Sequence, residues 1–291
     1  GSNGVIVVTT KKGTKDGNMH TSYSGMASWD VMKKELKMMN ADEYRDVRLG
    51  WGDTGVDLGG NYDWLDGVSR TGFTTQHTLS MSGGNAQSNY RVSVDYRNAH
   101  GIDLRSKREE YGARASMMHT TKGGLFTLTA NVAPRIIYRD QADWSVFKDA
   151  IEANPTTPLM DPENPARYYN FQGQVVGSNP VERQKLEKDH GDTKLLDWDG
   201  TVKLNLLPLL LKDGKGNHNL STQVMFADHQ YDNNTSWFRP STSTICINNG
   251  HDGEASRSYS KERQYVLEWL TDYTGTFGKH NVKGMAGYSY Q

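Results

Sequence analysis

Strict alternation of apolar and polar residues is the feature that most constrains this fold. In the run from Tyr90 to Arg97, every second residue is apolar or aromatic, and the residues between include two arginines and an aspartate. Successive side chains of a β-strand point to opposite faces, so this strand has one apolar face and one charged face. Similar alternation returns along most of the chain. The apolar faces can therefore join into one band while the charged faces share an interior.

The connections between the alternating runs differ in length in a regular way. The connections at 33–71, 139–195 and 232–258 are long and those at 83–87, 121–123 and 278–280 are short, while 99–108 is intermediate and 208–216 is of modest length. Successive connections of an up-and-down barrel lie at opposite rims, and outer-membrane barrels have short periplasmic turns and longer extracellular loops. We therefore predict an all-β fold, an antiparallel up-and-down transmembrane β-barrel. About nine strands are expected, at 20–32, 72–83, 88–98, 109–120, 124–138, 196–207, 217–231, 259–275 and 281–291.

Composition is compatible with this fold and excludes several classes of partner. The 291 residues have a mean hydropathy of -0.75 and contain no apolar stretch long enough for a membrane-spanning helix. A barrel shows only half of its strand residues to lipid, so low hydropathy does not exclude it. The net charge of -1 and the lack of a long basic block argue against nucleic acid. Cys246 is the only cysteine, so the chain forms no internal disulfide and no cysteine-based metal site.

Sequence motifs of enzymes are missing. The chain has no nucleophile elbow, no His-Glu-x-x-His, no P-loop and no dinucleotide fingerprint, so we predict that it is not an enzyme and needs no cofactor. The acidic, glycine-rich stretch at 53–60 makes Asp53 and Asp57 candidate ligands of a structural calcium ion. The stretch lacks EF-hand spacing, which favours a solvated turn-rich loop instead.

The polar positions of the alternating strands include candidate lumen-lining residues. Arg91, Asp95, Arg97 and Arg114 would face a polar lumen and contact solute or a plug. The alternative is a soluble sheet whose polar face meets water. Repetition of the pattern over about nine strands with one loop parity favours the lumen.

The long loops contain helical spacing and many aromatic residues. Short helices are expected at 41–49, after the cap-like pair Asn40 and Glu43, at 144–152 and at 181–188. The loop aromatics are candidate substrate-binding residues that stack on sugar rings or pack on peptide side chains. Alternatively, they anchor the loops through small internal cores. They are Trp51, Trp64, Trp144, Tyr168, Tyr169, Phe171, Trp237 and Phe238.

Several motifs in order along the chain resemble one family. Residues 1–13 run Gly-Ser-Asn-Gly-Val into an apolar segment that ends in Thr-Thr-Lys-Lys-Gly, and 77–84 read His-Thr-Leu-Ser-Met-Ser-Gly-Gly. Together with Asp63-Trp64, Arg70-Thr71-Gly72 and Asn89-Tyr90-Arg91, they resemble SusC/RagA-type TonB-dependent transporters. The resemblance implies that 1–13 is the last strand of a plug domain. Residues 14–291 would then be the N-terminal part of a barrel of about 22 strands.

The resemblance also implies a function and partners. The family imports oligosaccharides or peptides across the Gram-negative outer membrane, uses energy delivered by TonB, and works with a SusD-like surface lipoprotein. The TonB box and most of the plug lie outside this sequence. Two other interpretations stay open at this point: a soluble or surface-attached β-sandwich that binds carbohydrate through loop aromatics, and a non-transporting barrel that serves adhesion or assembly.

Overall fold

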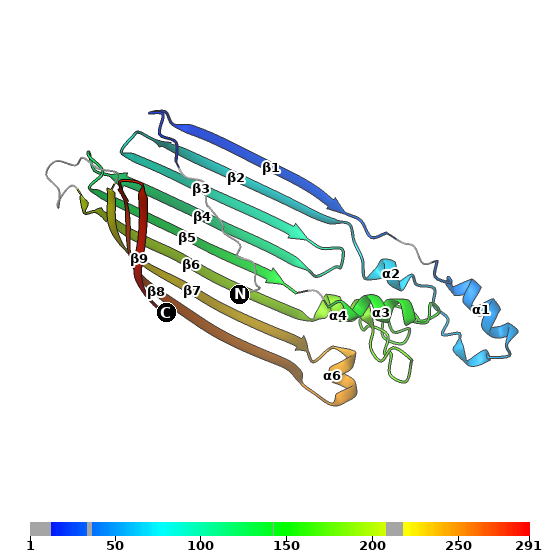
Figure 1. Ribbon diagram of the computed structural model, residues 1–291. Coiled ribbons are helices and arrows are strands. Elements are labelled where there is room, and N and C mark those ends of the chain that lie inside the picture. Colours follow the sequence, from blue (N-terminus) through cyan, green and yellow to red (C-terminus); the bar gives the residue numbers. More distant parts are fainter. Residues whose placement is uncertain (1–12, 34–36, 142, 208–217) are drawn as a thin grey trace.

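The computed structural model describes residues 13–33, 37–141, 143–207 and 218–291, so nearly all of the expected plug strand at 1–13 lies outside the described residues. In the described part, one antiparallel sheet contains nine strands, each paired with its neighbours in sequence (Figure 1). The nine strands expected from alternation are confirmed. They are β1 (His20–Asp30), β2 (Gly72–Gly84), β3 (Ser88–His100), β4 (Lys107–Thr120), β5 (Phe126–Asp140), β6 (Lys188–Asn205), β7 (His218–Pro240), β8 (Gly253–Phe277) and β9 (His280–Tyr290).

The two faces of the sheet differ as the alternation predicts. Val92, Val94 and Val202 lie on what we call the outward face, where Val94 is 49% exposed. Arg91 and Asp95 alternate with these valines and lie on the opposite, inward face. All described strands belong to one sheet. The β-sandwich interpretation, which requires two stacked sheets with the valines between them, is therefore wrong for this part of the chain.

A belt of aromatic side chains crosses the outward face at an angle to the strands. Phe73 on β2 is in register with Arg257 on β8 through the intervening pairs, but the belt meets β8 at Tyr265, eight residues further along. Eight residues correspond to about 27 Å along a strand and six strand steps to about 29 Å across the sheet. The belt thus runs at about 45° to the strands, the tilt that strands have in membrane barrels. Its ring contacts are Trp29–Phe73 at 5.2 Å, Tyr96–Tyr111 at 5.0 Å, Trp198–Phe226 at 5.3 Å and Phe226–Tyr265 at 6.1 Å.

Tight turns join β2 to β3, β4 to β5 and β8 to β9 at one end of the sheet, which we call the turn rim. In the turn between β2 and β3, the side-chain oxygen of Asn85 accepts hydrogen bonds from the backbone N–H groups of Gln87 (2.9 Å) and Ser88 (2.8 Å). Between β4 and β5, Gly123 and Gly124 have φ angles of 89° and 74°. This left-handed backbone is adopted readily only by glycine, so the sequence specifies a sharp reversal there.

The long connections at 31–71, 141–187 and 241–252 lie at the opposite end, the loop rim, and contain the helices (Figure 1). The short connection at 101–106 lies at the same rim. Within the described residues, the three connections predicted to be long lie at this one rim, as expected. No helix in the described ranges has the length and apolar character needed to cross a membrane. The helices are α1 (Ala41–Gly50), η1 (Thr54–Val56), α2 (Trp64–Gly67), α3 (Ser145–Glu152), α4 (Pro180–Leu186) and α6 (Thr244–Asn249).

The three helices expected in the loops are confirmed, with one shifted end. At the start of α1, Asn40 and Glu43 form a capping box, because each side chain accepts a hydrogen bond from the other's backbone N–H, at 2.9 and 3.1 Å. At the start of α4, the side-chain oxygen of Asn179 accepts hydrogen bonds from the backbone N–H groups of Val181 and Glu182, both at 3.1 Å. The prediction of helix up to Lys188 is wrong, since α4 ends at Leu186 and Lys188 begins β6.

Two of the expected loops are shorter than predicted. Loop residues were expected at 139–195 and 232–258, but β6 begins at Lys188, β7 continues to Pro240 and β8 begins at Gly253. Polar residues occupy both faces of these strand ends, so alternation disappears although the backbone ladder continues. Side-chain bonds across the strands support the extension, as in Asn234, which donates to Asp192 at 2.7 Å.

Candidate functional site: the inward face and the loop rim

An ion-pair network lies on the inward face of β3, β4 and β5. The Arg135 guanidinium lies 3.0 Å from the Asp95 carboxylate and donates to Glu110 at 2.8 Å. Arg108 forms a second ion pair with Glu110. Two carboxylates are therefore neutralised by two arginines, as partly buried charges require. Asp95 was predicted to line a polar interior, whereas the sequence analysis did not single out Arg135, Glu110 and Arg108, although all three follow the polar phase of their strands.

A glycine makes the contact between Arg135 and Asp95 possible. Gly112 stands between these residues in the row Asp95, Gly112, Arg135. A Cβ atom on Gly112 would come within 2.6 Å of the Asp95 carboxylate. The missing side chain thus leaves the space in which Arg135 reaches across β4. Gly191 does the same for Arg139, because a Cβ there would meet the Arg139 guanidinium at 2.8 Å.

Three other inward arginines differ in their contacts. Arg91 donates to the Ser80 hydroxyl at 3.1 Å. Within the described residues, neither the Arg97 side chain nor the Arg114 side chain has a hydrogen-bond or ion-pair partner. Both line a hollow of about 370 Å³ on the inward face, together with Asp95, Glu110, Arg135 and the polar residues Gln76, Thr78 and Ser93. The structure thus brings three of the four residues predicted to line the lumen to one site: Asp95, Arg97 and Arg114.

The loop aromatics divide into buried and exposed residues. Trp64 is 3% exposed and packs edge-on against the fully buried Phe171, with ring centroids 5.1 Å apart. The indole N–H of Trp64 donates to the Asn154 carbonyl at 3.1 Å. Tyr168 and Tyr169 pack against the same cluster, which we call the loop core and which joins the connections 31–71 and 141–187. Its buried members are Trp64, Val68, Val146, Ala150, Ala153, Phe171, Val176 and Val181.

The other candidate aromatics lie apart from the loop core. Trp51 is 73% exposed, and Trp144 is exposed and stacks on Phe147 with ring centroids 5.9 Å apart. Trp237 and Phe238 lie at the loop end of β7, where the Arg239 guanidinium sits 4.8 Å from the centre of the Trp237 ring. The structure therefore gathers Trp64, Tyr168, Tyr169 and Phe171 in the loop core and leaves the remaining four outside it.

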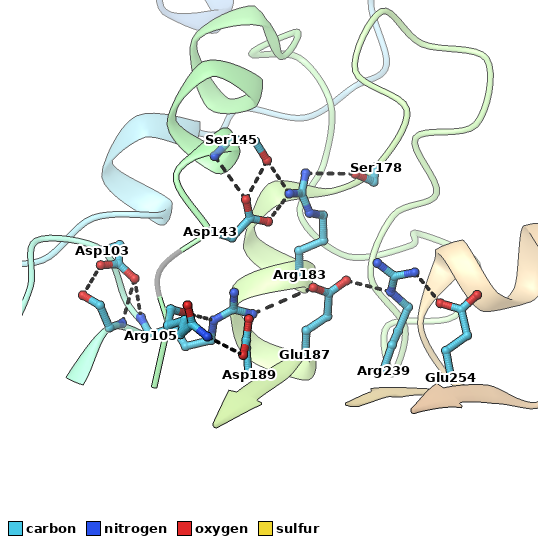
Figure 2. Close-up of polar contacts among 12 residues, drawn as sticks. Asp103, Arg105, Asp143, Ser145, Ser178, Arg183, Glu187, Asp189, Arg239 and Glu254 are labelled. Atoms are coloured by element: carbon cyan, nitrogen blue, oxygen red, sulfur yellow. Dashed lines mark hydrogen bonds and ion pairs between the residues drawn. The ribbon is translucent and has the colours of Figure 1, made fainter. Parts of the chain in front are cut away.

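A chain of ion pairs links the loop rim to the strands β7 and β8 (Figure 2). Arg105, from the connection between β3 and β4, lies 3.8 Å from Glu187, and Arg239 of β7 donates to the same carboxylate at 2.7 Å. Arg239 also donates to Glu254 of β8 at 2.6 Å. The Arg105 guanidinium further donates to the Gln141 carbonyl at 2.8 Å. Residues from sequence positions 105 to 254 are thus held in one network above the inward face.

A second polar cluster fixes the long connection 141–187. Arg183 on α4 pairs with Asp143 and donates to the Ser145 hydroxyl at 2.6 Å (Figure 2). It also pairs with Asp149 on α3. Burial opposes ionisation of Asp143, but Ser145 and the Arg183 guanidinium together hold its pKa below the usual value. On α4, burial raises the pKa of Glu182, although the hydrogen bonds from the backbone N–H and hydroxyl of Thr244 act to lower it. That contact joins α4 to the start of α6.

A larger hollow of about 740 Å³ opens between α1, α2 and the end of α3. Its surroundings include the exposed side chains of Met38, Met39, Ile151 and Val175. Exposed apolar side chains around a hollow are typical of surfaces that bind a partner or ligand. The sequence analysis missed this surface, because methionine and valine side chains in a long loop give no periodic signal.

The two candidate calcium ligands contact arginines instead. Asp57 lies 3.0 Å from Arg45, and Asp53 forms an ion pair with Arg48. The backbone N–H of Gly59 and the Arg45 guanidinium lower the pKa of Asp57. Among the described residues, no three potential metal ligands lie close enough to hold an ion.

Comparison with known proteins confirms the resemblance seen in the motifs. The chain is 32% identical to the TonB-dependent receptor SusC of Bacteroides thetaiotaomicron over 184 residues, which is 62% of this chain and 16% of that protein. It is 26% identical to the TonB-dependent receptor P3 of Formosa agariphila over all of this chain and 28% of that protein. The chain therefore spans less than a third of the length of these relatives. No family model matches it.

Solved structures show the same fold. The RagAB peptide importer in its closed-closed state superimposes on 96% of this chain, and the match covers 35% of the importer chain, with a TM-score of 0.75 and 16% identity. A second structure of the RagAB peptide transporter gives a TM-score of 0.72 over the same shares. The nine-stranded sheet thus corresponds to part of the β-sheet of such a chain, as expected from the sequence.

Proposed function

We propose that this chain forms part of the wall of an outer-membrane barrel that imports oligosaccharides or peptides with energy from TonB. In this proposal, residues 14–291 belong to the barrel and 1–13 end the plug. The loop rim is extracellular and the inward face lines the lumen. Arg91, Asp95, Arg97 and Arg114 then contact solute or plug, and the outward valines contact lipid.

The observation that carries the proposal is the division of one sheet into an apolar and a polar face. In water, a single sheet would leave its outward valines and leucines without cover, which is unfavourable over so large an area. Lipid removes this cost on the outward face, while the inward arginines keep access to water. The oblique aromatic belt supports the same arrangement, because aromatic girdles mark the membrane interfaces of barrels. The names of the curated relatives support the use of TonB.

Features of the loop rim favour binding of a partner protein at the cell surface. The hollow beside α1 and α3 has exposed apolar side chains at its edge, and the loop core and the Arg183 cluster hold α3 in place. We propose that a SusD-like lipoprotein docks there and closes over the mouth of the barrel. The exposed Trp51 and Trp144 lie in the same connections and would contact this partner or the cargo.

Purification of the full-length receptor from membranes tests the proposal. Extraction only with detergent, co-purification of one lipoprotein and mass spectrometric detection of a bound glycan or peptide are the expected results. Deletion of the receptor gene should abolish uptake of that ligand, and so should deletion of the TonB gene. A detergent-free, monodisperse receptor, or uptake that is unchanged without TonB, would contradict the proposal. Surface adhesion that persists while no solute is taken up would favour a non-transporting barrel.

A further inference from the structure

The inward face carries a strong separation of charge between two halves of the sheet. On β3, β4 and β5, six arginines and two acids point inward, and registers and alternation assign them to this face. The acids, Asp95 and Glu110, are both paired with arginines. This half therefore has an excess of positive charge. The arginines are Arg91, Arg97, Arg108, Arg114, Arg135 and Arg139.

The neighbouring strands carry the opposite charge. On β6, β7 and β8, seven acids but only Lys203 and Arg239 among the lysines and arginines point inward. Within the described residues, the side chains of Glu268 and Asp272 on β8 have no hydrogen-bond or ion-pair partner. This half of the wall therefore has an excess of negative charge. The seven acids are Asp189, Asp197, Asp199, Glu254, Glu262, Glu268 and Asp272.

Unpaired groups of both signs lie at the same depth relative to the aromatic belt. Arg114 lies three residues from Tyr111 toward the turn rim, and Glu268 lies three residues from Tyr265 in the same direction. Four strand steps and four residues of register separate Arg114 from Glu268, or about 23 Å along the sheet. An extended peptide of up to about seven residues spans this distance.

The hollow that contains Arg97 and Arg114 suits an anionic group. Its acids are already neutralised by Arg135 and Arg108, and the guanidinium groups of Arg97 and Arg114 have no partner in the part of the chain that the structure describes. Planar guanidinium groups bind carboxylates through paired, charge-assisted hydrogen bonds. Gln76, Thr78 and Ser93 add neutral hydrogen-bonding groups to the lining. A neutral sugar would not need two unpaired arginines.

We propose that this wall selects peptides by both of their charges. A carboxylate of the peptide binds Arg97 and Arg114, and its ammonium group faces Glu268 and Asp272. An acidic oligosaccharide would match only the first half, and a neutral one would match neither half. The inference rests on the proposed import function and narrows its cargo to short zwitterionic peptides.

The test uses the full-length receptor with its lipoprotein and four forms of one heptapeptide with uncharged side chains. The forms have free ends, an amidated C-terminus, an acetylated N-terminus, or both modifications. Amidation is expected to weaken binding to the wild type about tenfold, as loss of a charge-assisted contact does. In the double variant Arg97→Gln/Arg114→Gln, the free peptide should bind about tenfold more weakly, and amidation should have no further effect. Arg97→Lys/Arg114→Lys should retain part of the preference.

Two further variants complete the design. Glu268→Gln/Asp272→Asn should remove the effect of N-acetylation and keep that of amidation. Lys194→Gln is the matched control, because Lys194 is an exposed cation on the outward face, with no partner within the described residues. It should bind all four forms as the wild type does. Raising the salt concentration should weaken only binding of the charged forms.

Three results would overturn the inference and leave import intact. The first two are equal binding of all four peptide forms, and binding of a neutral or acidic oligosaccharide in place of peptides. The third is that the double arginine variant changes how the plug is cleaved by protease while its affinity for the peptide is unchanged. The last would assign these arginines to the plug. If cells that produce the wild-type receptor take up neither peptides nor oligosaccharides, the proposed function itself fails.

Discussion

Replacement of Arg183 by methionine should open the connection 141–187 without affecting the barrel strands. Methionine keeps much of the side-chain volume but removes the charge and all four hydrogen bonds of Arg183, to Asp143, Asp149, Ser145 and Ser178. The variant leaves two carboxylates without a cation in a partly buried place. Their side chains are only 22% and 21% exposed, and that of Arg183 is 13% exposed.

The size of the effect follows from this burial. Removal of one partner from a buried ion pair costs about 3–5 kcal/mol, because the remaining charge is unpaired. Partial exposure of the two aspartates favours the lower end, about 3 kcal/mol. A factor of ten in an equilibrium constant corresponds to about 1.4 kcal/mol, so the opening equilibrium of the connection should increase roughly 100-fold.

Hydrogen exchange with peptide-level mass spectrometry measures this opening in the full-length receptor. Peptides from 143–187 should exchange roughly 100-fold faster in Arg183→Met, while those from β3 and β4 stay unchanged. Lys148→Gln is the control on the same segment, because the Lys148–Glu152 pair is long at 3.8 Å and exposed. Its effect should stay below about 0.5 kcal/mol. Equal exchange in both variants would refute the assignment of Arg183 as the main polar support of this connection.

Three further changes should have distinct outcomes. Phe171 is fully buried, so Phe171→Ala should destabilise the loop core by about 3–5 kcal/mol. Trp144 is 63% exposed, so Trp144→Ala should cost less than about 0.5 kcal/mol. Equal shifts in melting temperature for the two variants would contradict this prediction. Burial raises the folded-state pKa of Glu182 above its usual 4.5. This group therefore stabilises the loops fully below pH 4.5 and loses that contribution as the pH rises through the raised pKa. Glu182→Gln should flatten this part of the pH profile of loop exchange, and an unchanged slope would count against the prediction. Gly112→Val should separate Arg135 from Asp95, because a Cβ would lie 2.6 Å from the Asp95 carboxylate, and should therefore lower the melting temperature. In the control Gly284→Val, where a Cβ would have no neighbour within 4 Å, the melting temperature should stay unchanged.

The sequence predicted the strands well where the two faces meet different surroundings. Around Val92 and Val94, apolar and polar residues alternate strictly, so both the existence and the orientation of β3 followed from the pattern. The same reasoning failed at the loop ends of β6, β7 and β8. Both faces are polar there, as at Asp192 and Asn234, and a pattern of alternation cannot detect a strand that has no apolar face.

The loop rim could be predicted only in part. Local signals identified α1, because Asn40 and Glu43 are three residues apart and cap the same helix end. The contacts of Arg239 with Glu187 and Glu254 join residues 52 and 15 positions apart, and no local pattern encodes such pairs. Residue type alone also could not separate Trp64, which is buried, from Trp51, which is exposed, since tryptophan is common both in cores and at binding surfaces.

The sequential order of the strands has a consequence for how the sheet assembles. Every strand pairs with the strand next to it in sequence, but the connections differ greatly in length. The connection between β5 and β6 contains 47 residues, and that between β2 and β3 contains three. Closing the longer one costs about 2 kcal/mol more in chain entropy. Hairpins such as β2–β3, β4–β5 and β8–β9 should therefore form early as ready-made building units, and the loop-rim contacts should join them late, once neighbouring units already lie edge to edge.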